Sequence, residues 1–162
     1  MVEYKAQITL IIMKVDLVVE GFLIMDKKVL LILHKKSGKW LGPGGHIDKN
    51  ETPDEALERE FKEEVGIEIK ILNRNDIPPS GDITKQLAVP FYVNVHNVRD
   101  HEHCCFYYLC RAKTRTIKPN KSEINDFGWF SREELTQQKI LPDTRNIALK
   151  AFDLSDSLGN SP

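Results

Sequence analysis

One amphipathic helix with defined ends constrains the fold of this chain most, and its pattern runs from Thr52 to Gly66. Its first four residues, Thr-Pro-Asp-Glu, form a capping box with proline at the first helical position. Leu57, Phe61 and Val65 recur every four residues and predict the buried face. Gly66 stands where a glycine commonly ends a helix. We therefore expect a helix that packs through one apolar stripe.

Strand patterns lie on both sides of this helix. The runs 17–25 and 28–34 are apolar and are separated by Asp26-Lys27, which predicts a hairpin buried on both faces. Further strands are expected at 67–72, 87–96, 103–112 and 124–130.

The C-terminal part predicts two more helices. A capping box begins at Ser131 and opens a short helix, and Pro142 opens a last helix that ends near Phe152. The tail 155–162 is expected to fray. Residues 73–86 form a long polar loop, and loops of this length in compact domains are often functional.

Length and composition fit a single domain over residues 1–162. The chain has 162 residues, of which 41% are hydrophobic and 29% are charged, so a core can form and disorder is excluded as the main state. Its 23 basic and 24 acidic residues give a net charge of −1, which provides no positive field for a nucleic acid polymer.

Cysteine content and hydropathy favour a cytoplasmic protein. The three cysteines, at positions 104, 105 and 110, are too few for a disulfide framework and indicate a reducing compartment. The apolar run 8–13 is too short to span a bilayer and lacks a cleavage site, so we expect neither a membrane span nor a signal peptide. Residues 1–16 are expected to form an N-terminal extension or an edge strand, and the apolar run is a candidate homodimer contact.

Three glutamates of the expected helix, Glu60, Glu63 and Glu64, share one arc beside the buried stripe. Like charges at this spacing repel, and a hard divalent cation with oxygen ligands relieves the repulsion. Arg59 stands four residues before Glu63 and can orient that carboxylate, and Glu51 can join from the preceding loop. On spacing alone, a solvated acidic face is the more common outcome.

The longer pattern around these glutamates favours a metal site over a solvated face. It consists of Gly45, five residues, Glu51, seven residues and then Arg-Glu-Phe-Lys-Glu-Glu-Val-Gly-Ile from Arg59 to Ile67. At average residue usage it recurs by chance on the order of once in ten million chains of this length. The pattern resembles the Nudix box of MutT-like hydrolases with every fixed position filled. The Trp-Leu-Gly-Pro-Gly-Gly segment before it, and the segment 129–135, are also similar to the family.

The Nudix resemblance implies an α+β fold, an α/β/α sandwich around a central mixed β-sheet. It implies a metal-dependent hydrolase that cleaves a nucleoside diphosphate linked to another moiety, with Mg²⁺ as cofactor and Mn²⁺ as substitute. Glu60, Glu63 and Glu64 would be metal ligands, and a backbone carbonyl of Gly44 or Gly45 is a further ligand candidate. These roles agree with the general chemistry of phosphate hydrolysis, in which bound cations neutralise charge and activate water.

The resemblance also implies catalytic roles. Arg59 would orient a glutamate, and Glu51 would support the site from its edge. A free carboxylate has to accept the proton of the attacking water. The candidates for this general base are Glu63, Glu64 and, from a loop, Glu102.

Several basic side chains outside the helix are candidate substrate-binding residues. His46 lies beside the box and can contact a substrate phosphate. Arg74 and Lys85 belong to the long polar loop and can form a substrate rim. His101 and His103 can bind phosphate if their strand faces the metal site.

A zinc site is an alternative role for these last histidines. His101, His103 and Cys105 alternate onto one face of the expected strand, and two histidines with a cysteine can bind Zn²⁺. Because no Cys-x-x-Cys spacing is present, we favour strand-end histidines and small core cysteines.

The sequence leaves the substrate open. Nucleoside triphosphates, including oxidised ones, are the default class, because subfamily signals outside the box are weak. ADP-ribose and nucleotide sugars are alternatives. A non-catalytic nucleotide sensor of the same fold is a third hypothesis, and the intact box argues against it.

Overall fold

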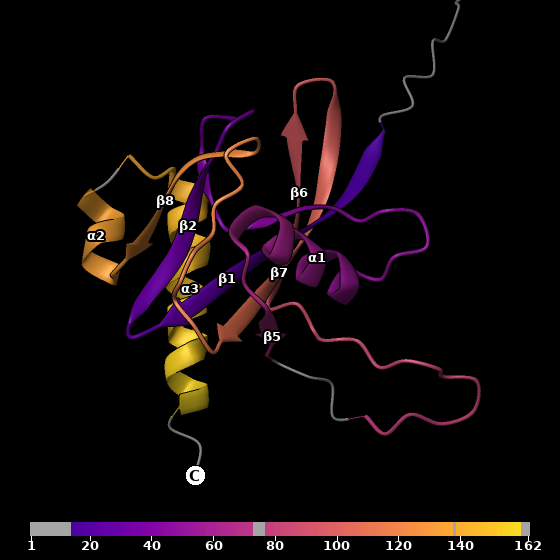
Figure 1. Cartoon of the computed structure of the whole chain (residues 1–162). Coiled ribbons are helices and arrows are strands. Elements are labelled where there is room, and N and C mark those ends of the chain that lie inside the picture. The colour runs from indigo at the N-terminus through magenta and orange to yellow at the C-terminus, as the bar shows by residue number, and fades with distance from the viewer. Residues whose placement is uncertain (1–13, 73–76, 138, 160–162) are drawn as a thin grey trace, which may run out of the picture.

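The computed structural model describes residues 14–72, 77–137 and 139–159 (Figure 1). Its strands are β1 (Val15–Met25), β2 (Lys28–His34), β3 (Trp40–Leu41), β4 (Gly44–His46), β5 (Ile69–Ile71), β6 (Tyr92–Val98), β7 (His101–Ala112) and β8 (Ile124–Phe130). Its helices are α1 (Pro53–Val65), α2 (Arg132–Gln137) and α3 (Pro142–Gly159).

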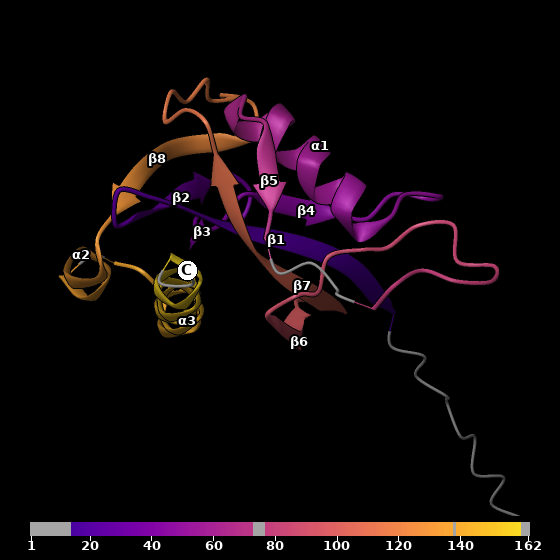
Figure 2. The ribbon, with the colours of Figure 1, turned by 90° about the horizontal axis from the view of Figure 1, so that it is seen from below.

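A mixed β-sheet forms the middle layer of the domain. β1 lies at its centre, parallel to β7 and antiparallel to β2 and β4. β5 and β6 add to β7, and β3 and β8 add to β2, all antiparallel. Figure 2 shows α1 on one face of the sheet and α3 on the other. This arrangement confirms the expected α/β/α sandwich.

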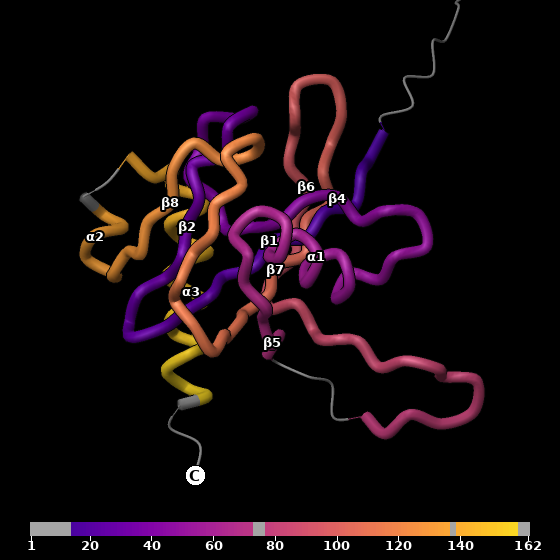
Figure 3. The backbone as a smooth tube through the Cα atoms, viewed as in Figure 1, coloured from indigo at the N-terminus to yellow at the C-terminus, as the bar shows by residue number. Residues whose placement is uncertain are grey.

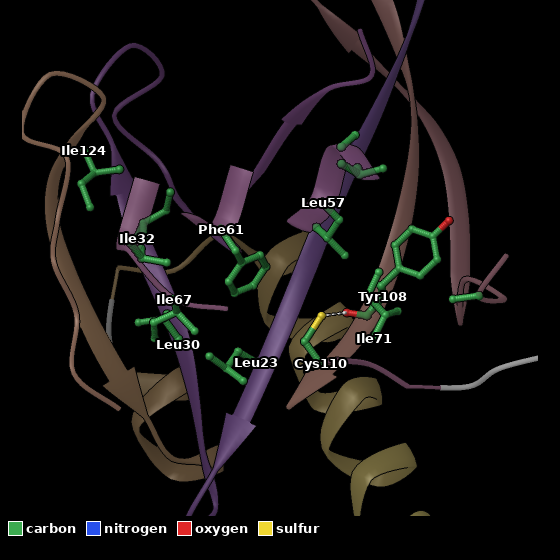
Figure 4. Packing of buried hydrophobic residues seen from close by; sticks show 14 residues of the cluster. Leu23, Leu30, Ile32, Leu57, Phe61, Ile67, Ile71, Tyr108, Cys110 and Ile124 are labelled. Atoms are coloured by element: carbon green, nitrogen blue, oxygen red, sulfur yellow. Dashed lines mark hydrogen bonds between the residues drawn. The ribbon is translucent and has the colours of Figure 1, made fainter. Parts of the chain in front are cut away.

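The hairpin of β1 and β2 is buried on both faces, as predicted. Asp26 and Lys27 have positive φ angles of 47° and 57°, which match a tight two-residue hairpin turn. Successive side chains of β1 point to opposite faces, so Leu23 joins the core beneath α1 while Phe22 joins the core beneath α3. Figure 4 shows the first of these two cores.

Helix α1 has the predicted ends. The Thr52 side chain accepts from the Glu55 N–H, and the Glu55 carboxylate accepts from the Thr52 N–H, which completes the capping box. Leu57, Phe61 and Val65 are fully buried. Gly66 ends the helix with a φ of 69°, a left-handed conformation that favours glycine.

Several predicted strand boundaries are wrong, because pairing with other strands determines where each strand begins. β7 begins at His101, two residues early, since its start pairs with both β1 and β6. β6 begins at Tyr92 and not at 87. β1 begins at Val15, so the last two residues of the expected extension belong to the central strand, whereas residues 1–13 lie outside the described chain.

The expected frayed tail is helical over 155–159, because α3 continues to Gly159. Arg132 pairs with Asp153 at 2.8 Å and with Asp156 at 2.7 Å, which fixes this end of α3 against α2. Residues 160–162 lie outside the described chain. Among the described residues, no helix combines the length and the apolar character that crossing a membrane requires.

One carboxylate of β1 is half-buried on the α3 side of the sheet. Burial raises the pKa of Glu20 to about 7, although the Gly42 N–H donates to its carboxylate at 2.8 Å. The unfolded chain releases this proton near pH 4.5, whereas the folded chain keeps it until about pH 7. The contribution of the Glu20 carboxyl group to the free energy of unfolding is therefore complete below pH 4.5, and it is lost as the pH rises to 7.

We predict that Glu20→Gln removes this loss, because the amide still accepts from Gly42 and carries no charge. Urea unfolding at pH 8 is expected to find the variant more stable than wild type by about 2 kcal/mol, with no difference at pH 4. The exposed Glu58→Gln on α1 is the control for the charge change. Equal stability of Glu20→Gln and wild type at pH 8 would contradict the burial argument.

Candidate active site

The carboxylates of α1 meet two glycines of β4. The Gly44 N–H donates to Glu64 Oε2 at 2.9 Å. Glu60 Oε1 occupies the space that a side chain at Gly45 would fill, and the backbone of β1 occupies that space at Gly44. Gly44 therefore has to be glycine, because a Cβ would clash with the backbone of β1, whereas a Cβ at Gly45 would displace the Glu60 carboxylate.

Arg59 joins the acidic residues into one network. Its guanidinium donates to Glu51 at 2.8 and 2.9 Å, to Glu60 at 2.8 Å and to Glu63 at 3.2 Å. It also donates to the carbonyl oxygen of His46 at 3.0 Å. Arg59 thus contacts both residues that the sequence analysis placed beside it, Glu51 and Glu63. Glu51 accepts two of its hydrogen bonds, whereas Glu60 and Glu63 accept one each.

The three glutamates differ in their surroundings. Glu64 is only 2% exposed, and burial raises its pKa to about 8 despite the Gly44 hydrogen bond. Burial also raises the pKa of Glu60, against the lowering effect of Arg59. The Glu63 side chain is 51% exposed. In contrast, the hydrogen bonds from Arg59 lower the pKa of Glu51.

This donor set fits a hard divalent cation. Glu60, Glu63 and Glu64 offer carboxylate oxygens, which are the ligands that Mg²⁺ and Mn²⁺ prefer. Burial is the main cause of the raised pKa values of Glu60 and Glu64, and a cation bound beside them would favour their charged forms.

A further acidic residue, which the sequence analysis missed, belongs to these surroundings. Repulsion by the Glu123 carboxylate raises the pKa of both Glu60 and Glu64. The chain reaches this position because the Asn120 N–H donates to the main-chain carbonyl of Glu64 at 2.8 Å. Its place directly before β8 carries no local signal, so only the tertiary structure reveals it.

Glu102 occupies a different place. It lies in β7 and not in a loop, opposite Asn97 of β6 and Val15 of β1. Strand alternation places it on the face of Phe106, which packs into the core beneath α1. The Glu123 carboxylate acts on both Glu60 and Glu64, and the Glu20 carboxylate acts on Glu64, whereas the Glu102 N–H donates to the Lys14 carbonyl at 2.9 Å.

The long loop contributes Lys85, whose ammonium binds the Glu55 carboxylate at 2.7 Å. Lys85 and Glu55 line a cleft of about 530 Å³ between this loop and α1, together with Glu58 but with none of the three box glutamates. Arg74, the second predicted rim residue, lies outside the described chain.

The predicted histidines gather on the other face of the sheet. His46 and His103 have ring centroids 4.9 Å apart, and the Nε2 atoms of His101 and His103 are 3.0 Å apart. Burial and the neighbouring histidines lower the pKa of His103 to about 4. Asp16 completes this group, whereas Cys105 is buried in the core beneath α3, as the core interpretation predicted.

Comparisons with known proteins agree with this geometry. The model of the NUDIX domain family matches residues 16–151. Nucleoside triphosphatase NudI of Escherichia coli is 30% identical over 111 residues, which are 67% of this chain and 72% of that protein. A NUDIX-family hydrolase from Clostridium perfringens is 32% identical with a TM-score of 0.76, over 86% of this chain and 97% of that one. A MutT NUDIX hydrolase from Burkholderia pseudomallei, 24% identical with a TM-score of 0.65 over 85% and 98% of the two chains, shares the fold. The family match over residues 16–151 agrees with the position of Glu64 against Gly44, and this chain belongs to the Nudix hydrolase family.

Proposed function

We propose that this Nudix pyrophosphohydrolase cleaves the diphosphate linkage of a nucleoside triphosphate by attack of a metal-activated water. The cluster of Glu60, Glu63 and Glu64 around Arg59 is the observation that carries the proposal. The substrate class is supported by the similarity to NudI, whose name describes a nucleoside triphosphatase.

The proposed cofactor is Mg²⁺, with Mn²⁺ as a substitute. Glu60, Glu63 and Glu64 would hold it, together with a carbonyl of Gly44 or Gly45. When bound, the cation supplies charge neutralisation of the phosphates and a bound water of lowered pKa. The oxygen ligands and the unbalanced negative charge support this choice.

The protein's own residues then have distinct roles. Arg59 holds Glu51 and Glu60 in place through hydrogen bonds of 2.8 Å, and the Glu60 carboxylate lies against Gly45 of β4. Glu63 is our first candidate for the general base, because it is exposed and its one hydrogen bond to Arg59 is long, at 3.2 Å. Glu64 is less suited, since burial favours its protonated form and Gly44 already donates to it.

The proposed substrate contacts lie around this centre. Lys85 and Arg74 of the long loop remain the candidate rim for the substrate, and a lysine that binds Glu55 through one exposed ion pair can exchange it for a phosphate. The predicted phosphate ligands His46, His101 and His103 lie on the sheet face opposite the box glutamates, so we do not place them among the contacts of the nucleotide.

A panel of nucleotides tests the reaction class. Release of phosphate and pyrophosphate would be measured with Mg²⁺ and with Mn²⁺ for canonical and oxidised triphosphates, ADP-ribose, nucleotide sugars and dinucleoside polyphosphates. Turnover of triphosphates that vanishes with chelator supports the proposal. Turnover confined to ADP-ribose or nucleotide sugars would replace the substrate class, and nucleotide binding without turnover would favour a sensor.

Substitution of Glu63 tests the proposed general base. Glu63→Gln is expected to lower kcat by about 100-fold or more, because the amide cannot accept a proton. Thermal unfolding without metal is expected to remain at the wild-type temperature, since the side chain is exposed. Glu68→Gln, at an exposed position three residues after α1, is the matched control and keeps its activity. Wild-type turnover in Glu63→Gln would remove this residue from the reaction.

The second prediction concerns the arginine network. Arg59→Lys is expected to lower stability by about 2 kcal/mol and turnover by at least about tenfold, because one ammonium cannot replace a planar group that binds three carboxylates. The control is Arg115→Lys, whose exposed pair with Asp26 contributes less than about 1 kcal/mol. Equal effects of the two substitutions would contradict the role of Arg59.

The third prediction separates two acidic residues outside the box. Glu123→Gln is expected to weaken activation by Mg²⁺ and to lower turnover, because its charge acts on Glu60 and Glu64. Glu102→Gln is expected to have the smaller effect. Titration of activity with Mg²⁺ in both variants measures the difference, and the opposite order would restore Glu102 as the candidate base.

A further inference from the structure

A second cluster of metal-binding side chains lies on the sheet face opposite the box glutamates. It is formed by Asp16 of β1, His46 of β4, and His101 and His103 of β7. We propose that these four residues bind one transition-metal ion of the zinc type, at a site separate from the Mg²⁺ site.

The sheet register brings the four residues together. Asp16 pairs with His103 across the parallel strands, and His46 pairs with Val18 two residues further along β1. Side chains two residues apart on a strand share a face, so Asp16 and Val18 point to the same side, as do His101 and His103. Figure 3 shows the start of β1 beside the hairpin of β6 and β7, where these strands meet.

The distances suit a tetrahedral ion. One ligand atom from each of the four side chains lies within 4.8 Å of every other. Asp16 Oδ2 is 3.6 Å from His101 Nε2 and 3.9 Å from His46 Nε2, and the two histidine Nε2 atoms of β7 are 3.0 Å apart. A zinc ion with bonds near 2.1 Å separates its four ligand atoms by about 3.4 Å, so small side-chain rotations complete the site.

The surroundings of His101 provide an independent argument. Its Nδ1 atom is 2.9 Å from the Asp100 carboxylate, while its Nε2 atom faces the cluster. A histidine that binds a metal through one nitrogen typically donates its other N–H to a carboxylate or carbonyl, which fixes the ring. Asp100 would fill this role here.

The chemistry of the cluster favours a cation over a phosphate. Asp16 places a carboxylate oxygen among the imidazoles, which repels an anion. In the structure the Lys14 ammonium binds the same Oδ2 atom at 2.9 Å, and this side chain is 74% exposed, so a metal can displace it at little cost. Imidazole suits Zn²⁺ better than Mg²⁺, whereas the oxygen ligands of the box suit Mg²⁺.

Four protein ligands make this a closed site, which is typical of structural zinc. The ion would connect β1, β4 and β7 at one end of the sheet. Its expected effect is to stabilise the position of β4.

The test uses the full chain, stripped of metal by chelator and then loaded with Zn²⁺ or with Co²⁺ as a spectroscopic probe. We expect one bound Zn²⁺ per chain and visible Co²⁺ absorption of tetrahedral type. The same result is expected for a Glu60→Gln, Glu63→Gln double variant, which disables the Mg²⁺ site. Asp100→Asn is expected to weaken Zn²⁺ binding by about 10–100-fold.

His101→Ala and His103→Ala are expected to abolish both signals, while metal-free thermal unfolding shows that they fold. His96→Ala is the matched control, because its ring lies 5.5 Å from that of His103 but outside the cluster. Absence of stoichiometric zinc in the wild type, unchanged zinc in folded His103→Ala, or loss of zinc in the glutamate double variant would overturn the proposal. If His103→Ala does not fold, the Zn²⁺ affinities of Asp100→Asn and His46→Ala test the proposal instead. Wild-type Zn²⁺ affinity in both of these variants would also overturn it.

Discussion

The close approach of α1 to the glycines of β4 is the contact on which the site depends. Glu64 accepts from the Gly44 N–H, and Glu60 occupies the space beside Gly45. Buried carboxylates are costly unless they are hydrogen-bonded or paired, so the absence of a side chain on β4 is a condition for the cluster. The fully buried stripe of α1 supplies the packing energy that holds the helix in this position.

The charge balance of this contact supports the proposed cation site. One guanidinium donates to Glu51, Glu60 and Glu63, so a single positive charge is shared by three carboxylates. Burial raises the pKa of Glu60 despite its hydrogen bond from Arg59 at 2.8 Å, and it raises the pKa of Glu64 despite the hydrogen bond from Gly44. If this site binds a divalent cation as proposed, the metal-free protein keeps an excess of negative charge there, which lowers its stability.

The sequence predicts the local features of the protein well and the non-local ones poorly. The ends of α1 depend on side chains within one turn, so Thr52 and Gly66 could be assigned without a structure. The limits of β6 and β7 depend on pairing with each other and with β1, which no local pattern encodes. Glu123 enters the surroundings of the box through a hydrogen bond from Asn120 to α1, a contact between segments far apart in sequence.

The histidine cluster also depends on contacts between segments that are far apart in sequence. Alternation along one strand predicts that His101 and His103 share a face, and it suggests Cys105 as a third member. The parallel register instead brings Asp16 to His103, while Cys105 lies deeper, in the core beneath α3. A metal site assembled from three strands can be inferred only when the strand order and register are known.

The short strand β4 connects the two faces of the sheet. Gly45 faces Glu60, and the next residue, His46, faces the histidine cluster, because successive residues of a strand alternate. A slip of one residue in the pairing of β4 with β1 would turn the His46 imidazole toward Glu60 and remove it from Asp16. Both proposed sites therefore require the same register, with His46 opposite Val18 and Gly45 opposite Val19. Arg59 reinforces it by binding the His46 carbonyl, so the network that organises the box also positions a member of the second cluster.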